Sequence, residues 1–273
     1  MPLPKADAAE AGANGRWGPW LLETEGLSKH FGGLKAVEDV TIRVRQGELH
    51  GIIGPNGAGK TTVFNLVTGI YEPTKGEIRI EGQSIVNLKP YEITQRGVAR
   101  TFQNIRLFGG LSVLDNVRIA YHRNVNYNVG EAMLRVPSFR SEEKELTDKA
   151  LDFLAVFGLE NRYQELARNL PYGEQRRLEI ARALASRPKL LLLDEPAAGM
   201  NPAEVSRLNE LITFIRERFQ LTIVLIEHQM KVVMSCCENI TVMDFGMVIA
   251  EGTPHEIQSN PKVIEAYLGK GVV

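Results

Sequence analysis

The chain is poor in cysteine and has no long apolar run. Its two cysteines, Cys236 and Cys237, are adjacent in an apolar segment. This pattern favours reduced core thiols in a cytosolic protein over a disulfide or a metal site. No apolar run approaches the length of a membrane span. The first residues include Asp7 and Glu10 and no hydrophobic region, so we expect no signal peptide and a membrane role only through a partner.

An excess of charge of one sign is also missing. The net charge is −1, so no overall basic field argues for a nucleic-acid surface. Hydrophobic residues make up 44% and charged residues 24% of 273 residues, which is ordinary for a soluble globular chain. This length suits one large domain or two small ones.

The most informative stretch is Gly54 to Thr62, directly after the apolar run Leu49 to Ile53. It reads GPNGAGKTT and matches the pattern G-x-x-x-x-G-K-[ST] in full. Its glycines let the backbone curl so that successive N–H groups face one concavity, which suits phosphate oxygens. The apolar residues that follow recur at helical spacing, and the dipole at a helix N-terminus favours anions. We therefore predict a phosphate-binding loop rather than a simple glycine-rich turn.

This loop implies a nucleotide with β- and γ-phosphates and Mg²⁺ as ligands. Lys60 would reach the β- and γ-phosphates, and the Thr61 hydroxyl would ligate Mg²⁺. The residues expected to contact nucleotide here are Gly54, Pro55, Asn56, Gly57, Ala58, Gly59, Lys60, Thr61 and Thr62. No internal repeat is visible, so we expect one nucleotide site of this kind in the chain.

Two further apolar runs end in polar residues. Leu190 to Leu193 precedes Asp194 and Glu195, and Thr222 to Ile226 precedes Glu227-His228. Such runs are typical of central strands in a parallel sheet covered on both faces. The first fits a Walker B strand, in which Asp194 would hold Mg²⁺ through water and Glu195 would polarise the attacking water. Read alone, an Asp-Glu pair after a strand is often a solvated loop start.

The remaining patterns predict local structure. Alternation from Leu21 to Val44 predicts an antiparallel pair broken at Phe31-Gly32-Gly33. Further strands are expected at Glu77 to Ile80, Gln83 to Ile85 and Val98 to Phe102, and helices at Leu146 to Phe157 and Arg176 to Ala185. Cap signatures at Asn201-Pro202 and Thr253-Pro254 predict two more helices. The stretch Tyr121 to Arg140 lacks periodicity and is expected to be a loop or a weak helix.

With these motifs and the segment Leu170 to Gln175, LPYGEQ, the chain resembles the ATP-binding subunit of an ABC transporter. That segment stands in the place of the family's LSGGQ signature. The resemblance implies an α/β P-loop NTPase of the ABC ATPase type, with a mixed core sheet, an antiparallel β subdomain and an inserted α-helical subdomain. We expect a disordered extension over residues 1–20, the ATPase domain over 21–269 with the insertion at about 104–187, and a tail over 270–273.

The resemblance also assigns roles to single residues. Gln103 fits the Q-loop glutamine near Mg²⁺ and the attacking water, and His228 fits the switch histidine that contacts the γ-phosphate. Phe31 fits the aromatic residue that stacks on adenine. Tyr172, Gly173 and Glu174 lie in the signature, which in this family caps the ATP of a second subunit. A polar strand end, a structural histidine or a core aromatic remains the alternative for each single residue.

Three positions depart from the family pattern. Pro171 replaces a serine, Tyr172 replaces the first glycine, and Asn201 replaces an aspartate after the Walker B strand. Proline removes both a hydroxyl and an N–H donor. We therefore expect the composite site that this signature completes, on the partner's ATP, to hydrolyse weakly. The site built on this chain's own Walker motifs keeps every expected group.

The subfamily signal lies in three segments, which are similar to importer ATPases for branched-chain amino acids. These segments are Phe31 to Ala36, Gly97 to Asn104 and Tyr172 to Glu179. Importers of urea or other amides look nearly the same, and lipopolysaccharide exporters also resemble the chain. A soluble ABC ATPase acting on ribosomes or DNA, and a kinase or GTPase, are the alternatives from other classes.

The resemblance implies a set of partners. These are two transmembrane permease subunits, a second ABC ATPase in a heterodimer or a homodimer, and indirectly a solute-binding protein, with no nucleic acid. The chain would lie peripherally on the cytoplasmic side of the plasma membrane. We expect a short permease helix to dock beside Gln103, against Phe102, Ile105, Leu107 and Phe108, although these residues could also be core.

Overall fold

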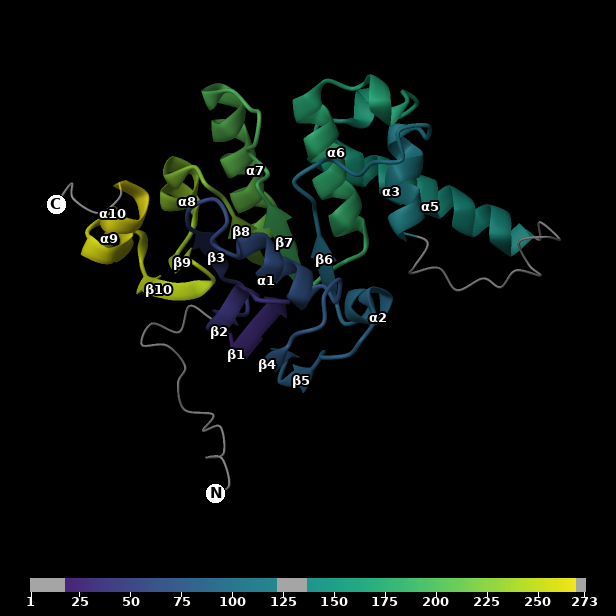
Figure 1. The fold of residues 1–273 in the computed structure, drawn as a ribbon. Helices are drawn as coiled ribbons and strands as arrows, with labels where there is room; N and C mark the ends of the chain where they lie inside the picture. The colour runs from purple at the N-terminus through teal and green to yellow at the C-terminus, as the bar shows by residue number, and fades with distance from the viewer. Residues whose placement is uncertain (1–17, 122–136, 269–273) are drawn as a thin grey trace. The chain divides into compact units, whose positions relative to one another are not determined.

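The structure is a computed structural model that describes residues 18–121 and 137–268, with the backbone alone over 137–143 and at 268. The chain divides into two compact units, Met1–Arg96 with Ile212–Val273, and Gly97–Leu211 (Figure 1). The predicted tail over 270–273, almost all of the predicted extension over 1–20 and most of the Tyr121 to Arg140 stretch lie outside the described residues.

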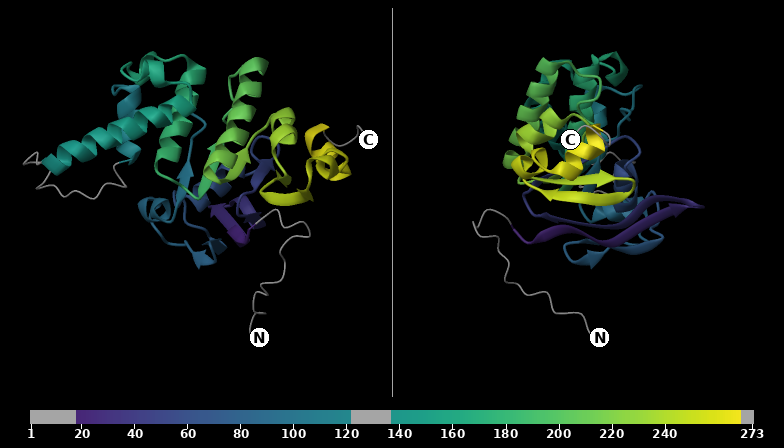
Figure 2. Two further views of the ribbon diagram at one scale, coloured as in Figure 1. Left: turned by 180° about the vertical axis from the view of Figure 1, so that it is seen from behind. Right: turned by 60° about the vertical axis from the view of Figure 1, so that its left-hand side comes forward.

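The first unit contains an antiparallel sheet with the strand order β2-β1-β4-β5. Strands β1 (Trp20–Phe31) and β2 (Leu34–Arg45) form the long pair visible at the right of Figure 2, and the break between them falls at Gly32-Gly33 as predicted. Strands β4 (Lys75–Ile80) and β5 (Gln83–Ser84) form the predicted hairpin.

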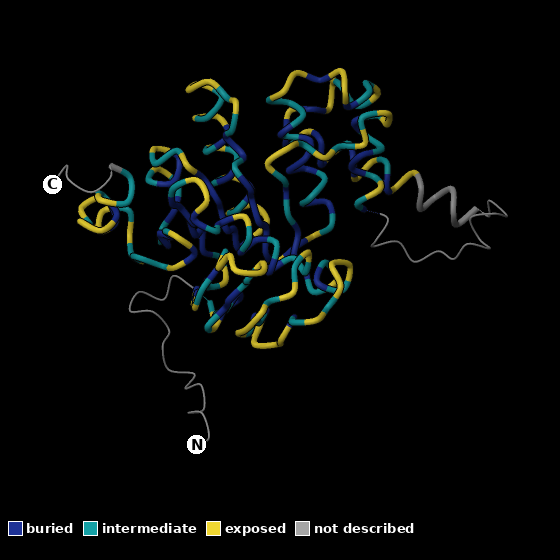
Figure 3. Tube along the Cα trace, in the orientation of Figure 1, coloured by how far each residue is buried: buried dark blue, intermediate teal, exposed yellow. Residues whose placement is uncertain are grey.

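The same unit contains the strands that carry the phosphate loop. Strand β3 (Leu49–Ile53) lies parallel to both β8 (Thr222–Ile226) and β9 (Asn239–Asp244). Strand β10 (Met247–Gly252) returns antiparallel to β9. Every residue of β3 and of β8 is buried, as expected for strands covered on both faces (Figure 3). The predicted bounds of β3 and β8 are confirmed.

Short helices lie between these strands or follow the last of them. They are α1 (Lys60–Val67), α2 (Pro90–Gln95), α8 (Met230–Cys236), α9 (Pro254–Gln258) and α10 (Pro261–Leu268). The predicted cap at Thr253 is confirmed, because its hydroxyl accepts from the Glu256 N–H while the Glu256 carboxylate accepts from the Thr253 N–H.

The second unit combines two parallel strands with helices. Strands β6 (Val98–Arg100) and β7 (Leu190–Asp194) are paired, and the helices include α3 (Val113–Tyr121), α5 (Pro137–Val156) and α6 (Tyr172–Ala185). Helix α7 (Pro202–Phe219) begins where predicted, since Asn201 Oδ1 accepts from the N–H groups of Ala203 and Glu204, both at 3.0 Å.

Helix α6 begins at Tyr172 rather than at the predicted Arg176. Pro171 is the N-cap, with φ −54°, an angle that proline adopts without strain. The first turn of α6 is therefore formed by the signature segment itself.

The cysteines are free thiols, as expected. The two sulfur atoms lie 4.0 Å apart, and burial raises the pKa of the Cys237 thiol well above its usual value. Of the helices in the described parts of the chain, none combines the length and the apolar character that a membrane crossing demands.

Candidate functional site

The phosphate loop requires glycine at two positions. A Cβ atom at Gly54 would lie 2.0 Å from the Met243 carbonyl oxygen, and one at Gly59 would lie 2.5 Å from the Ala36 carbonyl oxygen. Gly59 also has a φ of +97°, in the region that favours glycine. The loop is therefore packed closely against its neighbours, as the motif requires.

The loop ends at the start of α1, whose first N–H groups have no carbonyl partner within the helix. The N-cap residue is Gly59, which offers no side chain to satisfy them. The Lys60 ammonium is folded onto the loop and donates to the Gly54 and Pro55 carbonyl oxygens at 2.8 and 2.9 Å. Donor N–H groups, a helix dipole and a fixed cation thus meet at one loop, which suits an anion.

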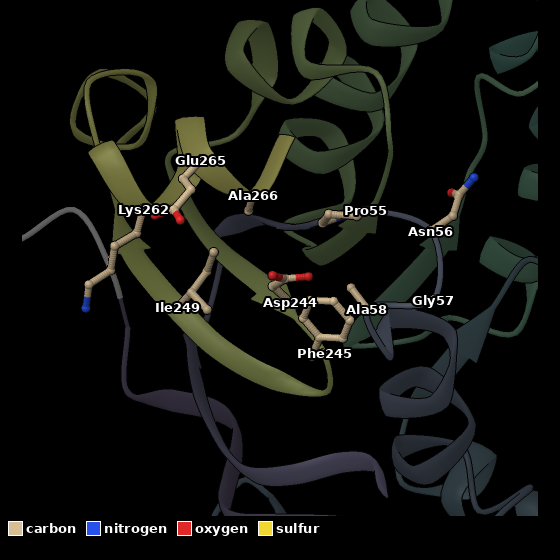
Figure 4. Close-up of a pocket in the computed structure, with 10 residues that line it drawn as sticks. All are labelled: Pro55, Asn56, Gly57, Ala58, Asp244, Phe245, Ile249, Lys262, Glu265 and Ala266. Atoms are coloured by element: carbon tan, nitrogen blue, oxygen red, sulfur yellow. The ribbon is translucent and has the colours of Figure 1, made fainter. Parts of the chain in front are cut away.

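A pocket of about 760 Å³ lies beside this loop (Figure 4). Figure 4 shows Asp244 and Phe245, at the turn between β9 and β10, on the side of the loop near Ala58. The other lining residues are Pro55, Asn56 and Gly57 of the loop, Ile249 of β10, and Lys262, Glu265 and Ala266 of α10. This pocket was not predicted from the sequence, because β9, β10 and α10 were not among the expected elements.

Helix α10 also approaches the loop through Tyr267. Burial raises the pKa of the Tyr267 hydroxyl, and the backbone of Gly54 offsets part of that rise. Tyr267 of α10 therefore lies near the backbone of Gly54, and its hydroxyl has no hydrogen-bond partner of good geometry among the described residues.

The predicted His228 and Phe31 belong to the same unit as the loop. In the parallel pair, Ile52 is opposite Ile226, so the phosphate loop and His228 leave the sheet at the same edge. The His228 side chain is 46% exposed, and the backbone N–H of His228 donates to the buried Glu227 carboxylate at 3.2 Å. Phe31 is half-exposed, and its ring centroid lies 5.2 Å from that of Tyr71 in an edge contact.

The second unit brings Asp194 next to an arginine that the sequence analysis did not single out. Arg100 Nη2 lies 2.7 Å from Asp194 Oδ2, and the two side chains are only 5% and 2% exposed. Among the described residues, the other carboxylate oxygen, Asp194 Oδ1, is buried and has no hydrogen-bond partner. A buried carboxylate oxygen without a donor suits a cation or a water that a cation holds.

Glu195 lies beside the predicted Gln103. Gln103 Nε2 donates to Glu195 Oε2 at 2.8 Å. Glu195 has a φ of +46°, an uncommon conformation for a residue other than glycine, and such strain often occurs at functional positions. The two side chains predicted to handle the attacking water are therefore in direct contact.

The signature residues occupy the first turn of α6. Tyr172 is 45% exposed, and Arg162 Nε lies 3.0 Å from the Glu174 carboxylate. A Cβ atom at Gly173 would lie 3.4 Å from the Glu204 carboxylate, so Gly173 lies next to the start of α7.

Within the described ranges, no cluster of three or more His, Cys, Asp or Glu side chains could hold a metal by itself.

Replacing Arg100 by methionine should destabilise the protein, because it leaves the Asp194 carboxylate buried without its cation. We expect the free energy of unfolding in urea to fall by about 3–5 kcal/mol. Arg79→Met is the control, since its pair with Glu25 is largely exposed and should cost no more than about 1 kcal/mol. Equal losses in the two variants would contradict a buried ion pair at Asp194.

Comparisons with known proteins agree with this geometry. Residues 37–198 match the family model described as "ABC transporter", and residues 247–273 match the model "Branched-chain amino acid ATP-binding cassette transporter". The chain is 46% identical over 250 residues to the high-affinity branched-chain amino acid transport ATP-binding proteins BraF of Pseudomonas aeruginosa and LivG of Escherichia coli. Each alignment covers 92% of this chain and 98% of the relative.

Solved structures give the same result for the fold. The ADP conformation of MJ1267, an ATP-binding cassette of an ABC transporter, matches with a TM-score of 0.79 and 32% identity, over 92% of this chain and 99% of that one. The expected fold class and the resemblance drawn from the sequence motifs are therefore confirmed. The chain belongs to the ABC transporter family, as an ATP-hydrolysing cassette with the C-terminal region of the branched-chain amino acid group.

Proposed function

We propose that this chain powers an importer of branched-chain amino acids. The observation that supports this solute is the 46% identity to BraF and LivG along 98% of their length. The test is uptake of radiolabelled leucine, isoleucine and valine by proteoliposomes that contain the chain with its permease and ATPase partners. ATP-dependent uptake of leucine is expected, and uptake of urea without leucine would assign the chain to an amide importer instead.

The phosphate loop would bind the triphosphate. The N–H groups at the start of α1 and the Lys60 ammonium would contact the phosphates, and Phe31 would stack on the adenine. The residues that would hold Mg²⁺ are Thr61, Gln103 and Asp194, whose Oδ1 is available for it. When bound, Mg²⁺ would neutralise the negative charge that develops on the phosphates.

Glu195 and His228 would orient the attacking water. The Gln103 amide holds Glu195 Oε2 at 2.8 Å, so the carboxylate has a fixed position from which to accept a proton. Phosphoryl transfer needs mostly positioning and charge stabilisation, which these groups supply.

We propose that the reaction requires a second ABC ATPase subunit. The signature residues Tyr172, Gly173 and Glu174 would cap the ATP of that subunit, and its signature would cap the ATP on this chain. The dimer would close on two permease subunits at the cytoplasmic face of the membrane and serve a solute-binding protein indirectly. In this proposal the ATPase domain spans residues 21–269, and its helical insertion spans about 104–187.

Helix docking beside Gln103 is the proposed contact with the permease. Phe108 is 49% exposed and is thus accessible to a partner, whereas Phe102, Ile105 and Leu107 are partly buried. Exposed and half-exposed apolar residues in one loop suit the apolar face of a short helix.

Replacing Pro171 by serine should leave or raise ATP hydrolysis in the assembled complex. Serine restores a hydroxyl and an N–H at the start of α6, where they can face the partner's ATP. The measurement is the steady-state rate of phosphate release with saturating solute. A loss of more than about 10-fold, equal to about 1.4 kcal/mol, would contradict the proposed role of the signature.

A further inference from the structure

The loop that receives the proposed permease contact has no regular secondary structure from Thr101 to Gly110. Its backbone polar groups therefore need partners outside a helix or a sheet. Arg176 of α6 provides two of them. Its Nη1 donates to the Phe102 carbonyl oxygen at 2.7 Å, and its Nη2 donates to the Gln103 carbonyl oxygen at 2.8 Å. One planar guanidinium thus holds two consecutive peptide groups.

Glu179, one turn further along α6, completes the contact. Its Oε2 accepts from Arg176 Nη1 at 2.7 Å, and its Oε1 accepts from the N–H groups of Phe102 and Arg106 at 3.4 and 3.1 Å. The two side chains are 0% and 1% exposed. Removing either side chain would therefore leave an uncompensated buried charge.

The same arginine reaches the signature. Arg176 Nη2 donates to the Tyr172 hydroxyl at 3.3 Å. The Tyr172 ring lies beside the loop after β7, since a Cβ atom at Gly199 would be 3.6 Å from it. The tyrosine that replaces the family's glycine therefore contacts the residue that holds the loop after β6.

We propose that Arg176 is a positioning residue that makes the loop Phe102–Arg106 and the first turn of α6 move as one body. A displacement of that loop by the permease then reaches Tyr172, which faces the ATP of the partner subunit. This inference rests on the proposed function, because it assumes the permease contact and the capping role. In this inference Tyr172 transmits the movement of the loop through its hydroxyl, which accepts from Arg176. The glycine that the family has at this position has no hydroxyl and could not do so.

Arg176→Lys tests the link, because lysine keeps the charge but cannot hold two carbonyl oxygens in a fork. In the purified chain, amide hydrogen exchange at Phe102 and Arg106 should rise by about 10-fold, the effect of losing one hydrogen bond to a charged group. Tyr172→Phe removes only the hydroxyl and should raise the same exchange by about 3-fold. Arg177→Lys, at the next position of α6, is the control and should leave the exchange unchanged.

The assembled transporter gives a second readout that a purely structural role would not change. The ratio of solute-stimulated to basal ATP hydrolysis should fall by about 10-fold in Arg176→Lys. Adding Tyr172→Phe to that variant should lower the ratio no further, because the two residues act through one link.

The inference is overturned if Arg176→Lys leaves both the exchange and the stimulation ratio unchanged. If Arg176→Lys does not fold, Tyr172→Phe is measured instead, because this variant keeps the half-exposed ring. Unchanged exchange and an unchanged stimulation ratio in Tyr172→Phe then overturn the inference. If the exchange effects appear but wild-type complexes are not stimulated by any branched-chain amino acid, the proposed function fails while the link between Arg176 and the loop stands.

Discussion

Replacing Glu195 by glutamine is expected to lower ATP hydrolysis by about 10²- to 10⁴-fold, the range for losing a general base. The amide is nearly the same shape and can still accept the 2.8 Å hydrogen bond from Gln103, so the loop should keep its geometry. It cannot take a proton from the attacking water. ATP binding should therefore stay intact, and ATP should hold the closed pair of subunits together.

Two measurements check this expectation. Single-turnover phosphate release gives the rate of the chemical step, and light scattering with ATP gives the fraction of paired subunits. Glu210→Gln is the matched control, because Glu210 is an exposed residue of α7 outside the site, and its rate should equal that of the wild type. Turnover near the wild-type rate in Glu195→Gln would remove Glu195 from the mechanism.

The second large effect is expected for Lys60→Ala, which should weaken Mg-ATP binding by about 100-fold or more. A unit charge pair about 4 Å apart near a protein surface is worth about 4 kcal/mol, and desolvation of the ammonium offsets part of it. The remainder, about 2.7 kcal/mol, corresponds to that factor. Equilibrium titration with a fluorescent ATP analogue gives the dissociation constant.

The control for Lys60→Ala is Lys262→Ala. Lys262 lines the pocket beside the phosphate loop but belongs to α10 (Figure 4). We expect its removal to change the dissociation constant by less than about 3-fold, as for an exposed charge. A larger effect at Lys262 than at Lys60 would mean that the phosphates bind on the α10 side of the pocket and not at Lys60.

The sequence predicts the parts of the fold in which local and global signals agree. Strands β3 and β8 are short, largely apolar runs that end at Gly54 and at Glu227, and the structure keeps their predicted bounds. The start of α7 was predictable because Asn201 and Pro202 are both favourable at a helix start. These elements needed no information about the rest of the chain.

Other parts could not be predicted because their signal is tertiary. Strand β10 is half-exposed along much of its length, so its residues do not alternate clearly. Arg100 and Arg176 look like surface residues in the sequence, since arginine is mostly exposed in proteins. In the structure the charge of Arg100 is buried against Asp194, which lies in the neighbouring strand β7. The charge of Arg176 is buried against Glu179, one turn further along α6. Only the i, i+3 spacing of Arg176 and Glu179 could have indicated that pair.

The ATPase rate of the purified chain as a function of its concentration, with and without the candidate partner ATPase, tests the central claim most directly. If the triphosphate is held by the loop at Lys60 and reacts only when a second subunit covers it, dilute chain should bind Mg-ATP but hydrolyse it slowly. The rate per chain should then rise with concentration or with the partner. A full rate that does not change on dilution to the monomer, or no affinity for Mg-ATP, would contradict the account.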